Sequence, residues 1–404
     1  MALALWTSAC PTMTYPLYQA DWGVSTTTIT WIFAAYPIAL IPVLLLFGNL
    51  SDHIGRRGSM LLGLGAQFIG VMLFALAGDV AWLLLGRVFM GVGVGLSISP
   101  ASVAMVEFSA PGRERRAGAV STATSALGIG LAMLVGGALT EYAPFPLHLN
   151  FLVLTVAIAA VACLVTVMPR HTPDGTKEWW RVRAISVPRG SRTIFFAGAI
   201  ALASSFLLGA IVLPLGAKIA QQLAGSTNAL ITGALLSVFA ACITIFAIVA
   251  RCLHVRLLVV LGAAGSMAAV WLFVLTGMVH SLLLFFLAAA VAGAAYAFDF
   301  AGGLTVMNRY APSTHRAGMV SGGYLVGYIA QGIGAPALGA VVTAHGLMPG
   351  LFTGAVVFGS FFAVTLVVGF TVLAPVRRAD RHAAQRVISS IQETAGTSTL
   401  KVRP

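Results

Sequence analysis

The stretch Gly48-Asn49-Leu50-Ser51-Asp52-His53-Ile54-Gly55-Arg56-Arg57 decides how the rest of this chain is interpreted. It separates two long apolar runs and carries most of the charge in its neighbourhood. Its glycines permit a tight turn and close helix approach, while Asp52 supplies a carboxylate and the two arginines supply forked donors. A short charged segment between long apolar runs is typical of a loop that joins two membrane-spanning helices.

Composition supports this interpretation for the whole chain. The 404 residues are 59% hydrophobic and 8% charged, and the mean hydropathy is +0.97. A soluble domain carries about 25% charged residues, so the class of soluble globular proteins is excluded. We predict an all-α integral membrane protein surrounded by the lipid bilayer. The net charge of +12 is therefore assigned to membrane topology, and no nucleic-acid partner is expected.

Twelve apolar runs approach or exceed the roughly 20 residues that a helix needs to cross the hydrocarbon. The first is short and begins directly at Met1, which is compatible with a start codon upstream or with a trimmed chain. Because it lacks a basic leader, a first transmembrane helix is favoured over a cleaved signal. The predicted spans are 1–19, 25–47, 59–78, 81–108, 117–140, 147–168, 193–217, 227–250, 256–278, 281–307, 317–343 and 349–374.

Positive charge orients these spans. If residues 48–57 lie in the cytoplasm, all 23 lysines and arginines lie on the cytoplasmic side except Lys218, which is outside, and Arg87, which is within a span. This distribution follows the positive-inside rule, and the opposite orientation would violate it. We therefore expect a multi-pass protein of the cell (inner) membrane with cytoplasmic N- and C-termini.

A repeat divides the chain in two. The sequence Arg-Ala-Gly-Ala-Val-Ser at 116–121 recurs as Arg-Ala-Gly-Met-Val-Ser at 316–321, and each copy follows an Ala-Pro pair. Parallel repeats of a six-helix unit produce such a pattern. The predicted domains are an N-terminal six-helix bundle (1–168), a cytoplasmic central loop (169–192), a C-terminal six-helix bundle (193–375) and a cytoplasmic basic tail (376–404).

The pattern G-x-L-x-D-x-x-G-R-R, placed after the second of twelve spans, resembles the loop between helices 2 and 3 of the major facilitator superfamily of transporters. Gly86-Arg87-x-x-x-Gly91-x-Gly93 is similar to the arginine motif in span 4 of that family. The resemblance extends over essentially the whole chain. It implies the major facilitator fold, in which twelve helices form two bundles around a central cavity that opens alternately to each side.

Span 5 indicates the branch of the family. Residues 128–137 read Gly-Ile-Gly-Leu-Ala-Met-Leu-Val-Gly-Gly, which resembles the antiporter motif G-x-x-x-G-P-x-x-G-G. Ala132 and Met133 replace its central glycine and proline, so the kink that proline gives the family's exporters is not expected here. The chain looks most like the drug:proton antiporter branch. These antiporters often carry an acid in span 1, and none occurs between Met1 and Ala20.

In the family, the loop between spans 2 and 3 pairs with the end of span 4 and closes the cytoplasmic side. The resemblance therefore implies a conformational latch. Exposed ion pairs contribute only about 0–1 kcal/mol each, so such a latch can break in every cycle. The alternative is that these charges only set the topology. The predicted latch residues are Gly48, Asp52, Gly55, Arg56, Arg57, Glu107 and Arg113.

Two charges inside spans are the predicted proton-coupling residues. Arg87 lies near the outer end of span 4, and in the family this arginine is implicated in proton coupling or in stabilising a buried acid. Its alternative is to reach the outer headgroups. Asp299 is the acid that lies deep inside a span, and a carboxyl group among apolar atoms readily takes up a proton. Its alternative is permanent pairing with a buried donor.

Polar and aromatic residues inside spans are candidates for the wall of the central cavity. Hydrogen-bonding groups are few among them, so a lipophilic or amphiphilic substrate is favoured over a sugar. For each aromatic residue, helix packing is the alternative. The predicted cavity residues are Tyr15, Tyr18, Trp31, Tyr36, Asn150, Tyr296, Tyr324, Tyr328 and Gln331.

No catalytic arrangement accompanies these residues. The chain has no metal-ligand spacing and no phosphate-binding lysine loop, and the Gly91-x-Gly93-x-Gly95 spacing inside an apolar helix indicates helix packing. We expect no enzyme activity, no cofactor and no metal. The predicted function is proton-coupled, multidrug-type efflux of small lipophilic compounds by a monomer, with a small-molecule substrate and protons as partners. The alternatives are a proton symporter or facilitator that imports a small metabolite or organic anion, and a membrane sensor.

Overall fold

The computed structural model describes residues 1–47, 50–107, 114–168, 187–223, 225, 228–312 and 315–373, and in these ranges every regular element is helical. Eleven of the helices are long and apolar enough to cross a membrane. The elements are α1 (Ala2–Ala9), η1 (Cys10–Met13), α2 (Tyr15–Trp22), α3 (Thr26–Phe47), α4 (Leu50–Ala75), α5 (Val80–Glu107), α6 (Glu114–Tyr142), α7 (Pro146–Val167), η2 (Arg189–Ser191), α8 (Arg192–Gln222), α9 (Ala229–Ala250), α10 (Val255–Val279), α11 (Leu282–Tyr310), α12 (Arg316–His345) and α13 (Leu347–Thr371).

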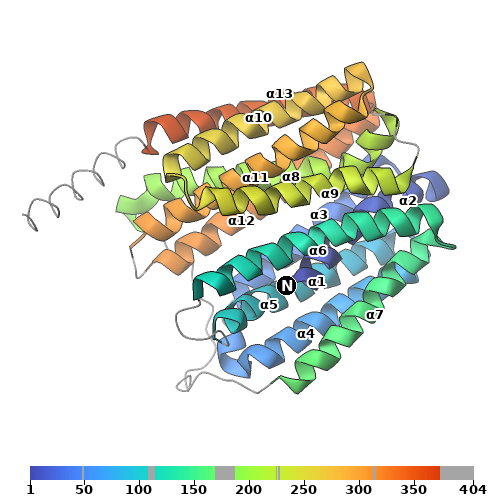
Figure 1. Ribbon diagram of the computed structural model, residues 1–404, viewed down its shortest axis with the longest axis horizontal. Helices are drawn as coiled ribbons and strands as arrows, with labels where there is room; N and C mark the ends of the chain where they lie inside the picture. The colour runs from blue at the N-terminus through green and yellow to red at the C-terminus, as the bar shows by residue number, and fades with distance from the viewer. Residues whose placement is uncertain are drawn as a thin grey trace, which may run out of the picture.

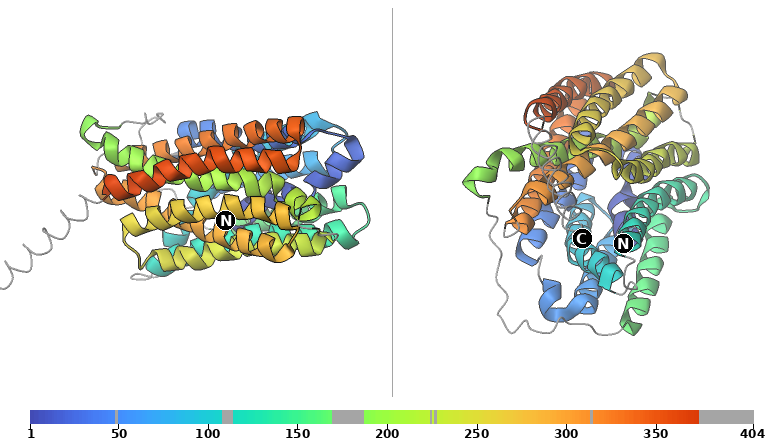
Figure 2. Two further views of the ribbon diagram at one scale, coloured as in Figure 1. Left: turned by 90° about the horizontal axis from the view of Figure 1, so that it is seen from above. Right: turned by 60° about the vertical axis from the view of Figure 1, so that its left-hand side comes forward.

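The helices run side by side, and those of the first part of the chain, α1–α7, lie on one side of the bundle (Figure 1). Helices α8–α13 lie on the other side, as the turned views also show (Figure 2). We call these groups the N-terminal and the C-terminal helices. They meet mainly where α3 packs against α12 and where α6 packs against α9. The predicted central loop (169–192) lies mostly, and the predicted tail (376–404) wholly, outside the described residues, so the domain boundaries stay a prediction.

The first predicted span is not one continuous helix. It consists of α1, the 3₁₀ turn η1 and α2. Pro11 and Pro16 carry no N–H, so neither can donate a backbone bond that would continue an α-helix. At the break, both the backbone nitrogen and the hydroxyl of Thr14 donate to the Pro11 carbonyl, at 3.1 and 3.0 Å. The prediction of a single first helix was therefore wrong in its continuity, although the segment lies among the other helices.

The charged stretch at 48–57 is more helical than the sequence indicated. Helix α4 begins at Leu50, well before the predicted start at residue 59, and a single non-helical residue interrupts it. That residue is Gly55, with φ 81° and ψ 158°. A side chain is disfavoured at this backbone conformation, so glycine is the residue that allows the sharp bend. Residues 50–54 of the predicted loop thus form the first turn of α4, and Gly55 bends the helix after it.

Glycines set the distance between α4 and α5. A Cβ on Gly63 would lie 2.7 Å from the Gly93 carbonyl oxygen, and a Cβ on Gly70 would lie 2.7 Å from that of Gly86. On another face of α5, Gly95 fits against Val43 of α3. Small residues let helix backbones approach closely in a membrane, where lipid gives no hydrophobic drive for association. The expectation that the glycine spacing in this span serves helix packing is confirmed.

The repeat also falls where the sequence indicated. The first copy lies in the first turns of α6, which begins at Glu114, and the second opens α12, which begins at Arg316. Both helices reach across to the opposite group, because α6 contacts α9 and α12 contacts α3. The repeated sequence thus begins two helices at which the two groups meet.

We expect Gly63→Ala to destabilise the protein and Gly65→Ala to leave it unchanged or slightly more stable. The added methyl group at Gly63 meets the backbone of Gly93, whereas at Gly65 nothing lies within 4 Å. Overpacking of this kind costs about 1–3 kcal/mol, and alanine in place of an exposed helical glycine gains up to about 1 kcal/mol. Thermal unfolding of the purified protein, followed by size-exclusion chromatography, measures both effects. Equal melting temperatures for the two variants would contradict the close packing of α4 and α5.

Candidate functional site

Arg87 is the largest completely buried side chain, and it lies on α5. Its Nε and Nη2 donate to the Tyr15 hydroxyl at 3.1 and 2.6 Å, and its Nη1 donates to the Ser8 carbonyl at 2.7 Å. The guanidinium therefore points into the N-terminal helices toward the broken first span. The alternative that Arg87 reaches the outer headgroups was wrong, because the side chain has no exposed surface.

The break in the first span explains why a backbone oxygen is available to Arg87. In the 3₁₀ turn that starts at Cys10, the i+3 donor to the Ser8 carbonyl would be the nitrogen of Pro11, which carries no hydrogen. That carbonyl can therefore accept from Arg87 instead. The tyrosine that follows the turn, Tyr15, is fully buried and supplies the second acceptor. The sequence analysis placed Tyr15 in the cavity wall but missed Ser8. The available signal was Pro11, a proline inside an apolar run, which leaves the carbonyl three residues earlier without its usual donor.

Aromatic rings complete the surroundings of Arg87. Its Cζ lies 5.8 Å from the ring centre of Tyr15, 5.7 Å from that of Phe33 and 5.6 Å from that of Tyr36. Ring faces attract a cation at this distance. Among the residues that the structure describes, no carboxylate forms an ion pair with Arg87. A guanidinium held only by neutral partners keeps its positive field, so this region favours negative over positive charge.

Asp299 lies on α11 and is also completely buried. The Ser266 hydroxyl on α10 donates to its Oδ2 at 2.8 Å. Its Oδ1 has no hydrogen-bond partner among the described residues. The carboxyl group fits against Gly262, where any side chain would overlap it. Asp299 thus faces α10 within the C-terminal helices, and the structure does not bring it together with Arg87.

A second aromatic group lies on the C-terminal helices. In α11, Tyr296 and Phe300 are nearly parallel, with ring centres 6.0 Å apart, and in α12, Tyr324 and Tyr328 are nearly parallel at 6.4 Å. The Phe206 ring on α8 lies edge-on to Tyr328 at 4.5 Å. We call this group, together with Phe239 at 5.8 Å from Tyr296, the aromatic cluster: Phe206, Phe239, Tyr296, Phe300, Tyr324 and Tyr328.

The aromatic cluster faces the N-terminal helices. Tyr328 packs against the apolar cluster that is formed mainly by N-terminal residues, and Tyr36 of α3 lies near both Tyr296 and Tyr328. The same Tyr36 ring stacks under Arg87. Gln331 lies beside the cluster, because its amide and the Tyr296 ring both approach Gly209 of α8. Four of the predicted cavity residues are therefore brought together with Tyr36, at the junction of the two groups of helices.

Other predicted cavity residues lie elsewhere. Tyr18 is buried with an unpartnered hydroxyl, and its ring centre lies 4.8 Å from that of Trp22. Asn150 on α7 is buried and accepts a hydrogen bond from the thiol of Cys10 at 3.5 Å. Trp31 has 51% of its surface exposed on α3. Tyr18 and Asn150 thus belong to the core of the N-terminal helices, and Trp31 is not part of either buried cluster.

The predicted latch is described only in part. Arg56 is buried, and its Nη1 donates to the Ser51 hydroxyl at 2.6 Å. Arg57 donates to the Met168 carbonyl, just after the end of α7, at 3.1 Å. Gly48, Arg113 and the side chains of Asp52 and Glu107 lie outside the described residues. The latch therefore stays a prediction.

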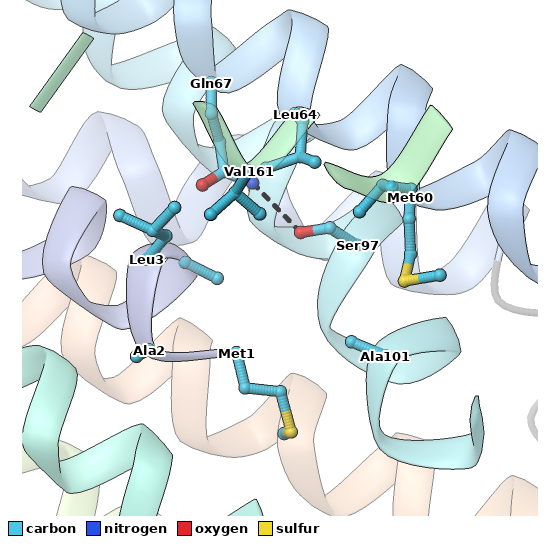
Figure 3. A pocket seen from close by; sticks show the side chains of 11 residues that line it. Met1, Ala2, Leu3, Met60, Leu64, Gln67, Ser97, Ala101 and Val161 are labelled. Carbon is cyan, nitrogen blue, oxygen red and sulfur yellow. Dashed lines mark hydrogen bonds between the residues drawn. The ribbon is translucent and has the colours of Figure 1, made fainter. Parts of the chain in front are cut away.

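A pocket of about 200 Å³ lies within the N-terminal helices, between α1, α4, α5 and α7 (Figure 3). Its wall is mostly apolar. Two polar residues, Gln67 and Ser97, also line it. Gln67 donates to Ser97 at 3.0 Å and to the Gly63 carbonyl, and it accepts from Thr7 at 3.1 Å. These amide contacts are made within the protein, and no predicted cavity residue lines this pocket. It is a packing feature beside the first helix.

The helical architecture, the buried charges and the facing aromatic residues are together those of a polytopic membrane transporter. A sequence model described as Major Facilitator Superfamily matches residues 1–253, more than half of the chain. The chain therefore belongs to the Major Facilitator Superfamily. The matching proteins are transporters and resistance proteins rather than enzymes.

Curated relatives match part of the chain. It is 31% identical over 159 residues to the puromycin resistance protein pur8 of Streptomyces alboniger, which covers 39% of this chain and 31% of that protein. It is 32% identical over 163 residues to the multidrug efflux pump LfrA of Mycolicibacterium smegmatis (39% and 31%). The riboflavin transporter RibZ of Clostridioides difficile is 24% identical over 160 residues (39% and 35%). The matches span about a third of the length of these relatives.

Solved structures match over nearly the whole chain. The nucleoside transporter NupG superposes with a TM-score of 0.72 and 16% identity, covering 91% of this chain and 96% of that one. A bacterial homolog of the human lysosomal transporter Spinster superposes with a TM-score of 0.72 and 17% identity (91% and 94%). At this identity the likeness establishes the shared fold. The predicted all-α membrane architecture and the predicted family are confirmed.

We expect Tyr15→Phe to destabilise the protein and Tyr18→Phe to have little effect. Both hydroxyls are buried, but that of Tyr15 accepts two bonds from Arg87, whereas that of Tyr18 has no partner. Removal of an acceptor from a buried charged donor costs about 1–3 kcal/mol. Thermal unfolding of the two purified variants measures the difference. If Tyr15→Phe has the same melting temperature as the wild type, the hydrogen bonds to Arg87 do not hold the first span in place.

Proposed function

We propose that this protein is a proton-coupled secondary active transporter that exports small, lipophilic compounds by alternating access. In the proposed orientation it lies in the cell (inner) membrane with both termini in the cytoplasm, and it works as a monomer. A proton gradient can drive such a cycle only if protonation favours one of the two conformations over the other. The proposal therefore requires a group inside the membrane that binds and releases a proton.

The observation that carries the proposal is the carboxyl group of Asp299. It is fully buried, one of its oxygens accepts from Ser266, and the other has no partner in the described part of the chain. A carboxylate in such a place lacks compensation for its charge, while a protonated carboxyl group does not need any. Because Asp299 lies between α10 and α11 and one residue before Phe300, its protonation can change how these helices pack beside the aromatic cluster.

The direction and substrate class are supported by the relatives. Their printed names include a puromycin resistance protein and a multidrug efflux pump. The riboflavin and nucleoside transporters among the matches have other substrates, so the fold alone does not select the compound. The aromatic cluster lies at the junction of the two groups of helices, which suits a lipophilic compound better than a sugar.

Alternating access also requires contacts that can close and open. At the end of the bundle where α2 lies, Thr27 at the start of α3 donates from its backbone and its hydroxyl to the Thr343 hydroxyl on α12, at 2.9 and 2.8 Å. Nearby, Lys218 of α8 donates to Thr26 at 2.6 Å, and Glu141 of α6 accepts from the Ala229 backbone at 2.6 Å. These contacts join the two groups of helices at the end that the charge pattern places outside.

The second candidate function is import of an organic anion by proton symport or facilitated diffusion. The specific observation that favours it is Arg87, which is buried without a carboxylate among its described partners. A substrate carboxylate or phosphate could supply the missing negative charge. Proton flux in the same direction as compound flux would select this function.

We expect Asp299→Asn to abolish proton-coupled transport in reconstituted vesicles of defined orientation. Asparagine keeps the shape and can still accept from Ser266, but it cannot bind and release a proton. A pH-sensitive dye inside the vesicles reports proton flux while neutral, cationic and anionic compounds are added under an imposed gradient. Asp21→Asn is the matched control, because this carboxylate is exposed on α2. Full pH-dependent transport by Asp299→Asn would exclude Asp299 as the proton carrier.

We expect Thr27→Cys combined with Thr343→Cys to form a disulfide under oxidant and to stop transport until reductant is added. The two hydroxyl oxygens lie 2.8 Å apart, and a covalent bond there prevents α3 and α12 from separating. The four native cysteines, which are free, are replaced first. The control is Thr28→Cys with Thr343→Cys, because the Thr28 hydroxyl bonds locally to Ser25. Unchanged transport by the cross-linked protein would mean that this end does not open during the cycle.

A further inference from the structure

The aromatic cluster carries polar groups that have no hydrogen-bond partner in the described part of the chain. The hydroxyls of Tyr296, Tyr324 and Tyr328 and the amide of Gln331 form no hydrogen bond with any residue in the described part of the chain, although all four residues are mostly buried. Their polar atoms are not among the fully buried unpartnered atoms of the structure, so they keep some exposed surface. Since they surround rings that face the other group of helices, they are arranged to bind the ring and polar atoms of a substrate.

Among the side chains that the structure describes, no carboxylate contacts this cluster. Asp299 lies on the same helix as Tyr296 and Phe300, but its carboxyl group fits against Gly262 and Ser266 of α10. On the opposite side, the Tyr36 ring that approaches Tyr296 and Tyr328 carries the Arg87 guanidinium at 5.6 Å from its centre. A buried positive charge therefore lies beside the Tyr36 ring, on the N-terminal side of the junction.

The charges around the aromatic cluster affect which substrates it can bind. A cation that leaves water loses much more solvation than contacts with ring faces return, unless a carboxylate neutralises it. In the described part of the chain no carboxylate lines the cluster, and the field of Arg87 opposes a second positive charge. An uncharged aromatic compound needs no counter-ion and gains the ring contacts in full.

We propose that the aromatic cluster with Gln331 is a binding site for uncharged aromatic compounds and that it discriminates against aromatic cations. The proposal rests on the proposed function, because it names the substrate class of that transporter. The proposal narrows the class of lipophilic substrates to uncharged compounds. Aromatic cations with the same ring system are expected to be poor substrates.

The test is equilibrium binding to the purified full chain in nanodiscs at neutral pH, with empty nanodiscs as the blank. The probes are phenanthridine, which is uncharged, and N-methylphenanthridinium, which has the same ring system with a permanent positive charge. We expect phenanthridine to bind at least about tenfold more tightly. Equal or tighter binding of the cation to the wild type would overturn the proposal.

Two variants test the position of the site. Tyr328→Leu removes a ring from the centre of the cluster and should weaken phenanthridine binding roughly three- to tenfold. Phe352→Leu is the matched control, because that ring is 52% exposed on α13 and contacts Trp271 instead of the cluster. Unchanged phenanthridine affinity in Tyr328→Leu, or an equal loss in both variants, would place the site elsewhere.

Gln331→Glu tests the charge argument by a gain of binding. The substitution keeps the shape of the side chain and adds the carboxylate that the site does not present. We expect its affinity for N-methylphenanthridinium to rise as the pH is raised and to exceed that of the wild type, while phenanthridine affinity changes little. Cation affinity that stays at the wild-type value over the whole pH series would overturn the proposal.

Because these measurements need no gradient, they separate this proposal from the proposed function. Loss of coupled transport in Asp299→Asn with failure of the probe preference would support the transporter and reject the substrate class. A clear probe preference without any coupled transport would support the site and reject proton-coupled export.

Discussion

In a membrane, polar groups must find their partners within the chain, because lipid offers none. The long helices satisfy most backbone groups, and several polar side chains inside them are paired across helices. Ser204 of α8 and Thr365 of α13 lie 2.9 Å apart, and Gln67 of α4 joins Ser97 of α5 and Thr7 of α1. The broken first span obeys the same requirement, since the Ser8 carbonyl at the break accepts from Arg87. The position of α5 is thereby tied to the position of the first span.

Each of the two groups of helices surrounds one buried ionisable side chain, and the surroundings differ. The N-terminal helices enclose a permanent cation, Arg87, with two oxygens and three aromatic rings. The C-terminal helices enclose a carboxyl group, Asp299, with one hydroxyl and one unpartnered oxygen. A guanidinium stays charged under all conditions, whereas a carboxyl group can lose its charge by binding a proton. This asymmetry is the physical basis for proposing that the proton is carried by the C-terminal helices and that Arg87 sets a constant field at the junction.

Glycine and threonine have complementary roles at the helix contacts. Gly137 of α6 and Gly233 of α9 bring the two groups of helices into backbone contact, since a Cβ on Gly137 would lie 2.7 Å from the Ala229 carbonyl oxygen. Close contacts of this kind are extensive but weak per residue, and the hydrogen bonds between Thr27 and Thr343 are between uncharged groups. A hydrogen bond between two threonine hydroxyls can separate without leaving an unpaired charge in the membrane. They are suited to an interface that opens and closes.

The sequence by itself determined the class, the family and most helix positions, because the length of the apolar runs and the placement of arginines are direct consequences of the bilayer. It also singled out Arg87 and Asp299, since charges within apolar runs are costly and stand out. It did not show that the first span breaks at Cys10 or that Gly55 bends α4 instead of ending a loop, because both depend on local backbone geometry. Nor could it show what the charges contact. That Asp299 faces Ser266, and that Tyr36 lies near Tyr296 and Tyr328, depends on how each helix is rotated and which helices pack together. Only the tertiary structure decides that, because residues distant in the chain share a site through helix packing and not through sequence spacing.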